Sequence, residues 1–351
     1  MLNYIHDSDP NIIAEKLLDW YDQNARILPW REPPYSTQIP DPYKVWLSEI
    51  MLQQTQVVTV IDYFLKFIKR WPTVSDLANA KEDEIMHAWA GLGYYSRARN
   101  LHKCAKEVVT KYQGVFPKDE MSLQALPGIG PYTSAAVASI AFNQRANVID
   151  GNIERVMARF LRFESFLPKA KKELLLEIEP FIHSSRPGDY AQALMDLGAT
   201  ICTVKNPNCA HCPLSFTCAA FKNDAIQYYP RKKKREKTPH KFGYLYLIQN
   251  DQREIGIEKR AANEMLGGLY GFPTSDWRVG EFSHSGKYGE MIENLEIIET
   301  NHKIIHVFTH FKLTLIVVKG KKNDGFQFVS KDKLDHYGFP KLMQKAFHFI
   351  I

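Results

Sequence analysis

The chain has 351 residues, a length that suggests two or three domains. With 45% hydrophobic and 24% charged residues, its composition is typical of a globular protein. No run approaches the roughly 18 apolar residues of a membrane span, which argues against a membrane partner. The net charge of +6 permits a polyanionic partner without requiring one.

The first two thirds of the chain has a helical pattern. From Asn11 to about Phe221, apolar residues recur every three or four positions, and the pattern breaks at proline or glycine. We therefore expect a mainly α domain over residues 1–222. The clearest predicted helices are Ile12–Tyr21, Val45–Trp71, Glu82–Trp89, Arg97–Tyr112, Tyr132–Phe142, Ile153–Phe163 and Lys169–Phe181.

The pattern changes after a basic run, Arg231–Pro239. Such a run is typical of a solvated linker, with contact to phosphate as the alternative, and we predict a linker over residues 223–239. Apolar residues then alternate with a period of two in Tyr244–Ile248, Glu254–Ile257 and Leu313–Val318, which indicates strands. A separate α+β domain is therefore expected over residues 240–351.

Four of the five cysteines lie within seventeen residues, as Cys202, Cys209, Cys212 and Cys218, spaced C-x6-C-x2-C-x5-C. Four thiolates so close together can surround one soft metal centre. The uneven spacing favours a [4Fe–4S] cluster. Structural zinc is the main alternative, although zinc sites more often show two close pairs of cysteines. Disulfides are the third, but a chain of this length can bury a core without them.

The segment Leu126–Thr133 contains two glycines, Gly128 and Gly130, directly before an apolar helix. Glycines let a backbone turn tightly and approach a ligand, and the free N–H groups of the following helix can bind a phosphate. Leu-Pro-Gly-Ile-Gly before a helix of small residues is the helix-hairpin-helix pattern. An ordinary turn between helices is the alternative.

Two carboxylates are candidates for chemistry. Glu49 lies in a helix that is apolar nearly all round, so burial should raise its pKa and keep it protonated as a general acid. The alternative is a glutamate on a surface stripe. Asp150 follows about twenty residues after the glycine turn and precedes a helix. It either caps that helix or faces a cleft, where a carboxylate can stabilise a developing cation.

Two further segments have residues suited to DNA. Gln53–Gln56 places four polar groups in a row, which we expect to continue the helix begun at Val45 and to bind base edges. Gly91–Arg99 combines glycine, tyrosine and arginine, and its aromatic side chains could stack on bases or wedge between them. Core packing is the commoner role of tyrosine.

Together these segments resemble the MutY adenine DNA glycosylases, of the helix-hairpin-helix superfamily that includes endonuclease III. The resemblance spans nearly the whole chain. It is strongest in Leu28–Arg31, Asp41–Val57, Gly91–Leu101, Leu126–Ile140, Ile149–Arg159, Ala193–Ala199 and the four cysteines. It implies a two-lobed helical core that grips DNA, an iron–sulfur loop over residues 202–218 and a smaller Nudix-like domain.

The resemblance also implies an activity, the removal of adenine mispaired with 8-oxoguanine or guanine in double-stranded DNA. By position, Glu49 is the acid that protonates adenine N7 and Asp150 the carboxylate that stabilises the sugar cation, with Tyr132 and Asn152 beside them. The adenine pocket falls on Trp30, Arg31, Leu52 and Gln192. The residues that fill or wedge the DNA stack fall on Gln54, Thr55, Leu92 and Tyr94. Superfamily members with lyase activity have a lysine where this chain has Tyr132, so we expect a monofunctional glycosylase.

In the second domain, Met265–Pro273 is similar to a signature of the Nudix-like MutY C-terminal domain. We find no glutamate-rich Nudix metal box and expect no pyrophosphate hydrolysis. Phe308, Thr309 and His310 resemble the Phe-Ser-His loop that reads 8-oxoguanine, with threonine in place of serine. A second departure is Glu32–Pro40, which is several residues longer than in typical members.

Two other functions remain as alternatives, a helix-hairpin-helix glycosylase with another base choice and a catalytically silent DNA-binding module. The adenine-pocket residues and the Phe308–His310 loop argue against the first alternative. The presence of both Glu49 and Asp150 argues against the second. We expect a cytoplasmic monomer that associates with the nucleoid when it binds DNA.

Overall fold

The structure is a computed structural model that describes residues 9–233, 238–261, 264–288 and 297–350. It divides into two compact units. The first combines Met1–Asn79 with Asn100–Lys234, and the second combines Ala80–Arg99 with Arg235–Ile351. The predicted domain limits at residues 222 and 240 stay a prediction. Within the described part of the chain, no helix has both the length and the apolar character that crossing a bilayer requires.

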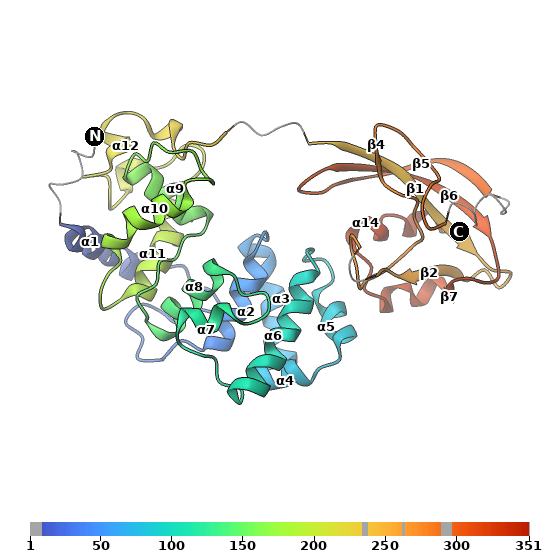
Figure 1. Ribbon diagram of the computed structural model, residues 1–351, viewed down its shortest axis with the longest axis horizontal. Helices are drawn as coiled ribbons and strands as arrows, with labels where there is room; N and C mark the ends of the chain where they lie inside the picture. The colour runs from blue at the N-terminus through green and yellow to red at the C-terminus, as the bar shows by residue number, and fades with distance from the viewer. Residues whose placement is uncertain (1–8, 234–237, 262–263, 289–296, 351) are drawn as a thin grey trace. The chain divides into compact units, whose positions relative to one another are not determined.

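The first unit is helical (Figure 1). Its helices are α1 (Pro10–Asn24), α2 (Pro42–Leu52), α3 (Val57–Arg70), α4 (Val74–Asn79), α6 (Ser96–Tyr112, whose first turn belongs to the second unit), α7 (Glu120–Gln124), α8 (Pro131–Phe142), α9 (Gly151–Phe160), α10 (Lys171–Ile178), α11 (Pro187–Thr200) and α12 (Ala219–Lys222). The unit also contains three short 3-10 helices, which are η1 (Glu179–Phe181) after α10, η2 (Cys209–His211) after α11 and η3 (Ile226–Tyr228) after α12. Except between Val45 and Trp71, the helices predicted from periodicity are confirmed, with small changes at their ends.

Two largely buried helices, α8 and α11, form the centre of this unit. α8 is buried from Thr133 to Ala141 and packs against α2, α7 and α11. α11 also contacts α1 and α9. Because both helices are surrounded by others, side chains at their ends and on their inner faces can project into a shared pocket rather than into solvent.

The prediction of one helix over Val45–Trp71 was wrong. α2 ends at Leu52 and α3 begins at Val57, so the polar segment Gln53–Gln56 is a loop. Gln54 has a left-handed φ of 61°, which an α-helix cannot contain. None of these four residues is apolar, so a helical turn here would have no side chain to pack against the core. The helix therefore ends, and the chain turns at this point.

The second unit contains α5 (Glu82–Trp89) and a mixed β-sheet, which confirms the predicted α+β class. The strands run in the order β3-β2-β1-β6-β5, with β4 paired to β1 and β7 to β2. Their bounds are β1 (His240–Gln249), β2 (Ile255–Lys259), β3 (Tyr270–Gly271), β4 (Arg278–Val279), β5 (Ile297–Val307), β6 (Lys312–Lys321) and β7 (Gln327–Val329). η4 (Lys331–His336), α14 (Lys341–Gln344) and η5 (Phe347–Phe349) follow.

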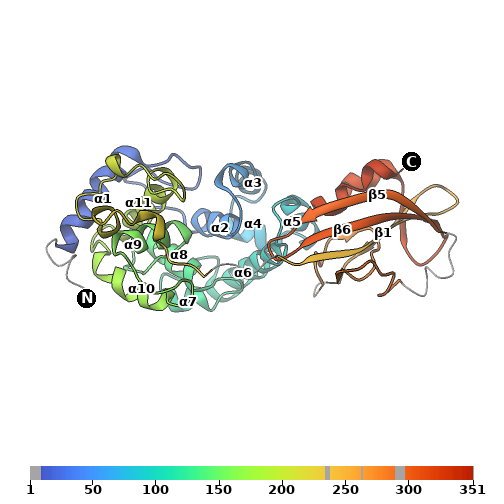
Figure 2. The same cartoon turned by 90° about the horizontal axis from the view of Figure 1, so that it is seen from above.

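Strands β1 and β6 are parallel and form the middle of the sheet, and β5 lies antiparallel beside β6 (Figure 2). Alternate side chains of β1 go to opposite faces, as period two requires. Leu245 and Leu247 join the core that includes Phe339 and Met343, whereas Tyr244 and Tyr246 join a smaller aromatic cluster. Both faces of the central strands are therefore covered.

Candidate active site

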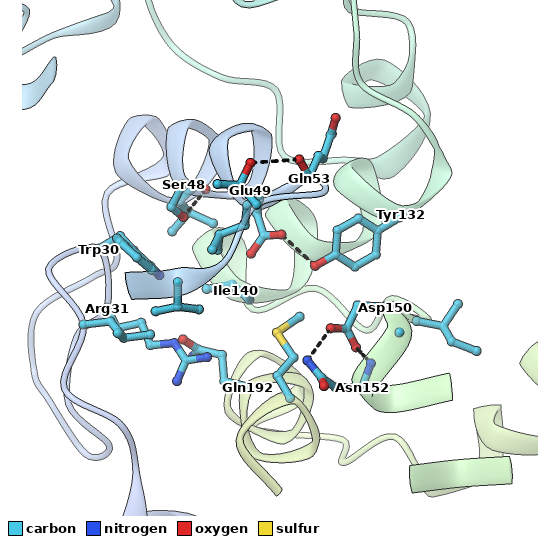
Figure 3. Close-up of a pocket in the computed structure, with 18 of the residues that line it drawn as sticks. Trp30, Arg31, Ser48, Glu49, Gln53, Tyr132, Ile140, Asp150, Asn152 and Gln192 are labelled. Atoms are coloured by element: carbon cyan, nitrogen blue, oxygen red, sulfur yellow. Dashed lines mark hydrogen bonds between the residues drawn. The ribbon is translucent and has the colours of Figure 1, made fainter. Parts of the chain in front are cut away.

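A pocket of about 530 Å³ opens in the helical unit where α2, the loop after it, α8, α9 and α11 meet (Figure 3). All eight residues that the sequence assigned to the catalytic group and the adenine pocket line it. They are Glu49, Asp150, Tyr132, Asn152, Trp30, Arg31, Leu52 and Gln192. These side chains come from segments more than 160 positions apart, so the fold brings together what the sequence separates.

Glu49 projects from the buried side of α2 and is only 5% exposed. The hydroxyl of Tyr132, in the first turn of α8, donates a hydrogen bond of 2.7 Å to Glu49 Oε2. Burial raises the pKa of Glu49 to about 7, although this hydrogen bond opposes the rise. A carboxyl group with such a pKa is partly protonated at neutral pH and can act as a general acid.

Asp150 both caps α9 and faces the pocket, so the two interpretations of its role are compatible. Its Oδ1 accepts hydrogen bonds from the backbone N–H groups of Asn152 at 2.9 Å and Ile153 at 2.7 Å. Its Oδ2 accepts one from the Asn152 side chain at 3.0 Å. Burial raises the pKa of Asp150, and these three donors oppose the rise because they stabilise the ionised form.

The opposite side of the pocket is formed by Trp30, Arg31 and Gln192 (Figure 3). Trp30 packs edge-on against Phe64, with ring centroids 5.2 Å apart. Arg31 Nη1 donates to both carboxylate oxygens of Asp196 at 2.9 Å, and Asp196 is completely buried. Asp196 therefore fixes the position of Arg31, a function that nothing in the local sequence indicated.

Gln192 is 5% exposed and lines the same pocket. Its amide can both donate and accept hydrogen bonds, which makes this side chain a candidate for binding a ligand.

Lys171 is a second residue that sequence reasoning missed. It lines the same pocket, and its Nζ donates to the carbonyl oxygen of Ile149 at 3.1 Å. It lies at the start of α10, about twenty positions from Asp150, and no motif marks it. Only the packing of α10 against the turn before α9 brings this amine near the carboxylates.

Arg155 on α9 connects the pocket to the cysteine loop. Its Nη2 donates to Asn152 Oδ1 at 2.9 Å and to the carbonyl of Gly198 at 2.7 Å, while its Nε donates to the carbonyl of Cys202 at 2.8 Å. A Cβ atom on Gly198 would lie 2.6 Å from the Cβ of Asn152, so α11 can approach Asn152 this closely only with glycine.

The four clustered cysteines line one cavity together with apolar side chains and Arg159. All five cysteines are free thiols in the structure. Arg159 Nη1 lies 3.3 Å from Cys202 Sγ and also donates to the carbonyl of Thr203 at 2.7 Å. Among the described residues, no three cysteine, histidine or acidic side chains approach closely enough to hold a single metal ion.

The two hairpin glycines have different structural requirements. Gly128 has a φ of 77°, and a Cβ there would lie 2.7 Å from the Cβ of Asn100, so the turn itself needs glycine. Gly130 has no atom within 4 Å of such a Cβ. A side chain would therefore meet no steric conflict at this position.

The residues predicted to contact the DNA stack fall into two places. Gln54 and Thr55 line the pocket that holds Glu49. Leu92 and Tyr94 instead line a cavity of about 550 Å³ in the second unit, which also contains Phe308, Thr309 and His310. There the hydroxyl of Tyr94 contacts that of Thr309.

Two family models match the chain. The HhH-GPD superfamily base excision DNA repair protein model matches residues 47–180, and the NUDIX domain model matches residues 244–348. Among curated relatives, the adenine DNA glycosylase of Buchnera aphidicola (subspecies Baizongia pistaciae) is 36% identical over 88% of this chain and 86% of its own. The adenine DNA glycosylase of Rattus norvegicus is 34% identical over 88% of this chain and 70% of its own.

Solved structures are similar to the helical part. A thermostable thymine-DNA glycosylase aligns with a TM-score of 0.53 and 28% identity, over 61% of this chain and 97% of its own. A trapped endonuclease III–DNA covalent intermediate aligns with a TM-score of 0.50 and 22% identity, over 61% of this chain and 95% of its own, a likeness of fold alone.

Proposed function

Because this chain belongs to the adenine DNA glycosylase family, we propose that it hydrolyses the N-glycosidic bond of adenine mispaired with 8-oxoguanine or guanine. The product is an abasic site in double-stranded DNA. The observation that supports this most strongly is the pair of carboxyl groups in one pocket, Glu49 held by Tyr132 and Asp150 held by three N–H donors.

Cleavage of this bond needs a better leaving group and a stabilised sugar cation. The adenine must first leave the base stack, because neither carboxyl can reach it inside the duplex. Glu49 then donates its proton to N7 of adenine, and the base departs with the bonding electrons. Asp150 faces the positive charge that develops at C1′, and a water molecule adds to C1′ and loses its proton to complete the hydrolysis.

The rest of the pocket recognises the base. Arg31 and Gln192 provide hydrogen-bonding groups for the edge of adenine, and Trp30 and Leu52 provide apolar surface for its ring. The Asp196 carboxylate holds the Arg31 guanidinium in place, so little rotamer freedom is lost when adenine binds.

We propose that Cys202, Cys209, Cys212 and Cys218 hold a [4Fe–4S] cluster. A single tetrahedral zinc ion needs its sulfurs about 3.8 Å apart, given Zn–S bonds of about 2.3 Å. A cluster takes one thiolate at each of its four irons, and the four cysteines line one cavity together. The cluster would fasten the end of α11 to the start of α12, and the Arg159 N–H near Cys202 suits a thiolate.

In the second unit, Phe308, Thr309 and His310 are proposed to read 8-oxoguanine together with Leu92 and Tyr94. The turn at Gly128 and Gly130 is proposed to bind a DNA phosphate through the first N–H groups of α8. Gln54 and Thr55, which line the catalytic pocket, are proposed to contact the bases next to the extruded adenine.

The test is base release under single-turnover conditions from matched duplexes. Adenine opposite 8-oxoguanine and opposite guanine should be excised, and thymine opposite guanine should not. Release of thymine alone would replace this proposal with a thymine-mismatch activity. Borohydride trapping on the same duplexes tests monofunctionality, since a trapped adduct would require an amine. Lys171→Ala would then identify whether the amine in the pocket is responsible.

A further inference from the structure

A second cavity of about 570 Å³ lies next to the catalytic pocket in the same unit. The two cavities share four lining residues, Trp30, Arg31, Ile140 and Gln192. Of these, Trp30, Arg31 and Gln192 lie on the side of the catalytic pocket away from Tyr132 and Asp150 (Figure 3). The rest of the second cavity is lined mostly by residues 32–40, the end of α8 and the start of α11.

The segment 32–40 is the stretch that departs in length from the family pattern, and one of its residues is held in an unusual conformation. Tyr35 has a φ of 60°, which a bulky side chain rarely adopts, and it lines the second cavity. Strain of this kind persists only where surrounding contacts hold it, and it is concentrated at functional positions.

Those contacts fix one face of the Tyr35 ring. The guanidinium of Arg186 lies 4.4 Å from the ring centroid. Arg186 is itself held by Asp22 at 2.6 Å and 3.1 Å and by Asp189 at 2.8 Å. Tyr35 is nevertheless 73% exposed. An aromatic ring that is fixed on one face and open on the other is a ready platform for stacking a flat ligand.

The shared residue Gln192 supplies the polar half of such a site. Its buried amide can pair with the N6 and N7 edge of adenine, which is the pairing that glutamine prefers. Because Gln192 lines both cavities, its amide oxygen can accept from the N6 amino group of adenine in the catalytic pocket, where N7 takes the proton of Glu49, and its amide can pair with both N6 and N7 in the second cavity. The volume of the second cavity lies within the range of small-molecule sites, roughly 300–1,000 Å³.

We propose that this second cavity is a product site that takes free adenine, stacked on Tyr35, after the base has left the sugar. The inference rests on the proposed function. In that function, the abasic strand still occupies the entrance beside Asp150 when the base is released. The free adenine therefore cannot leave by the route through which it entered. The base then leaves on the opposite side, past Arg31 and Gln192.

The test measures binding of free adenine to the full-length protein without DNA, and inhibition of base excision by added adenine. Tyr35→Ala should weaken both by about 5- to 150-fold, the range produced by loss of one base–aromatic stack. Tyr35→Phe keeps the ring and should restore both. Tyr228→Ala removes another exposed tyrosine of the same unit, 66% exposed, and should change neither.

Single-turnover excision by Tyr35→Ala should equal that of the parent, because product release follows the chemistry. Adenine binding that is lost in Glu49→Gln but unchanged in Tyr35→Ala would place the free base in the catalytic pocket and overturn the inference. Failure of the proposed function is a different result, since the parent protein would then release no adenine from any duplex.

Discussion

Arg155 donates from Nη2 to the side-chain oxygen of Asn152 at 2.9 Å, and Asn152 in turn donates to Asp150 at 3.0 Å. The same guanidinium binds the carbonyl of Cys202 through Nε. One arginine thus fixes the orientation of the amide that binds the carboxylate of Asp150, for which we propose a catalytic role, and also binds the start of the cysteine loop.

From this relationship we expect Arg155→Gln to lower the single-turnover excision rate by about 10- to 100-fold, the range seen when a supporting contact misplaces a reacting group. DNA binding should fall much less. Arg145→Gln, which removes an exposed arginine bonded only to the carbonyl of Glu179, is the matched control. Equal rates for Arg155→Gln and the parent would show that Asn152 keeps its orientation without the guanidinium.

The two carboxylates should each be required for chemistry but not for binding. Glu49→Gln and Asp150→Asn should bind substrate duplex normally and lose excision by several orders of magnitude, because both groups act on charge that develops in the transition state. With the pKa of Glu49 near 7, the parent rate should fall as the pH rises above about 7. A rate that rises over that range would contradict the role of Glu49 as the acid.

The buried Glu49 should also affect stability. Its folded pKa of about 7 lies above the ordinary value of 4.5. Its contribution to the free energy of unfolding is therefore fully present below pH 4.5 and is lost as the pH rises through about 7. Glu49→Gln should abolish this loss, a relative gain on the order of 3 kcal/mol at most at high pH. Thermal unfolding of the parent, of Glu49→Gln and of the exposed control Glu173→Gln, at about pH 5 and pH 9, measures it.

The four cysteines that line one cavity predict the metal content of the purified protein. The purified protein should be brown and contain about four irons per chain. Cys202→Ser should lower the iron content and the unfolding temperature, whereas Cys104→Ser should leave the iron unchanged, because Cys104 is buried in α6 away from the cavity. One zinc and no iron after anaerobic preparation would establish the alternative metal.

The cavity of the second unit predicts where lesion preference originates. His310→Ala should reduce the preference for adenine opposite 8-oxoguanine over adenine opposite guanine by about 5- to 150-fold, since one base-edge contact is worth roughly 1–3 kcal/mol. Excision itself should persist, because Glu49 and Asp150 lie in the other unit. Thr309→Ser keeps the hydroxyl near Tyr94 and serves as the control. Both duplexes must be compared at one salt concentration, because phosphate contacts vary steeply with ionic strength.

Much of this protein could be predicted from the sequence, because local physics determines it. Helical periodicity located α5, α6 and α8, and the alternating pattern located β1 and β6. The burial of Glu49 followed from a helix that is apolar all round. The cap formed by Asp150 followed from its place before α9.

Other features depend on tertiary structure, since they arise from segments that meet only after folding. Nothing near Asp196 indicated that it would hold Arg31, and nothing near Lys171 indicated that its amine would line the catalytic pocket. The break at Gln54 was missed because the local sequence allows polar residues within a helix. Whether the helix continues there depends on whether the segment can pack against the rest of the fold, which the local sequence does not show. The second cavity exists only because residues 32–40 fold against α11 and present Tyr35, and a contact between segments so far apart leaves no periodicity or motif in either one.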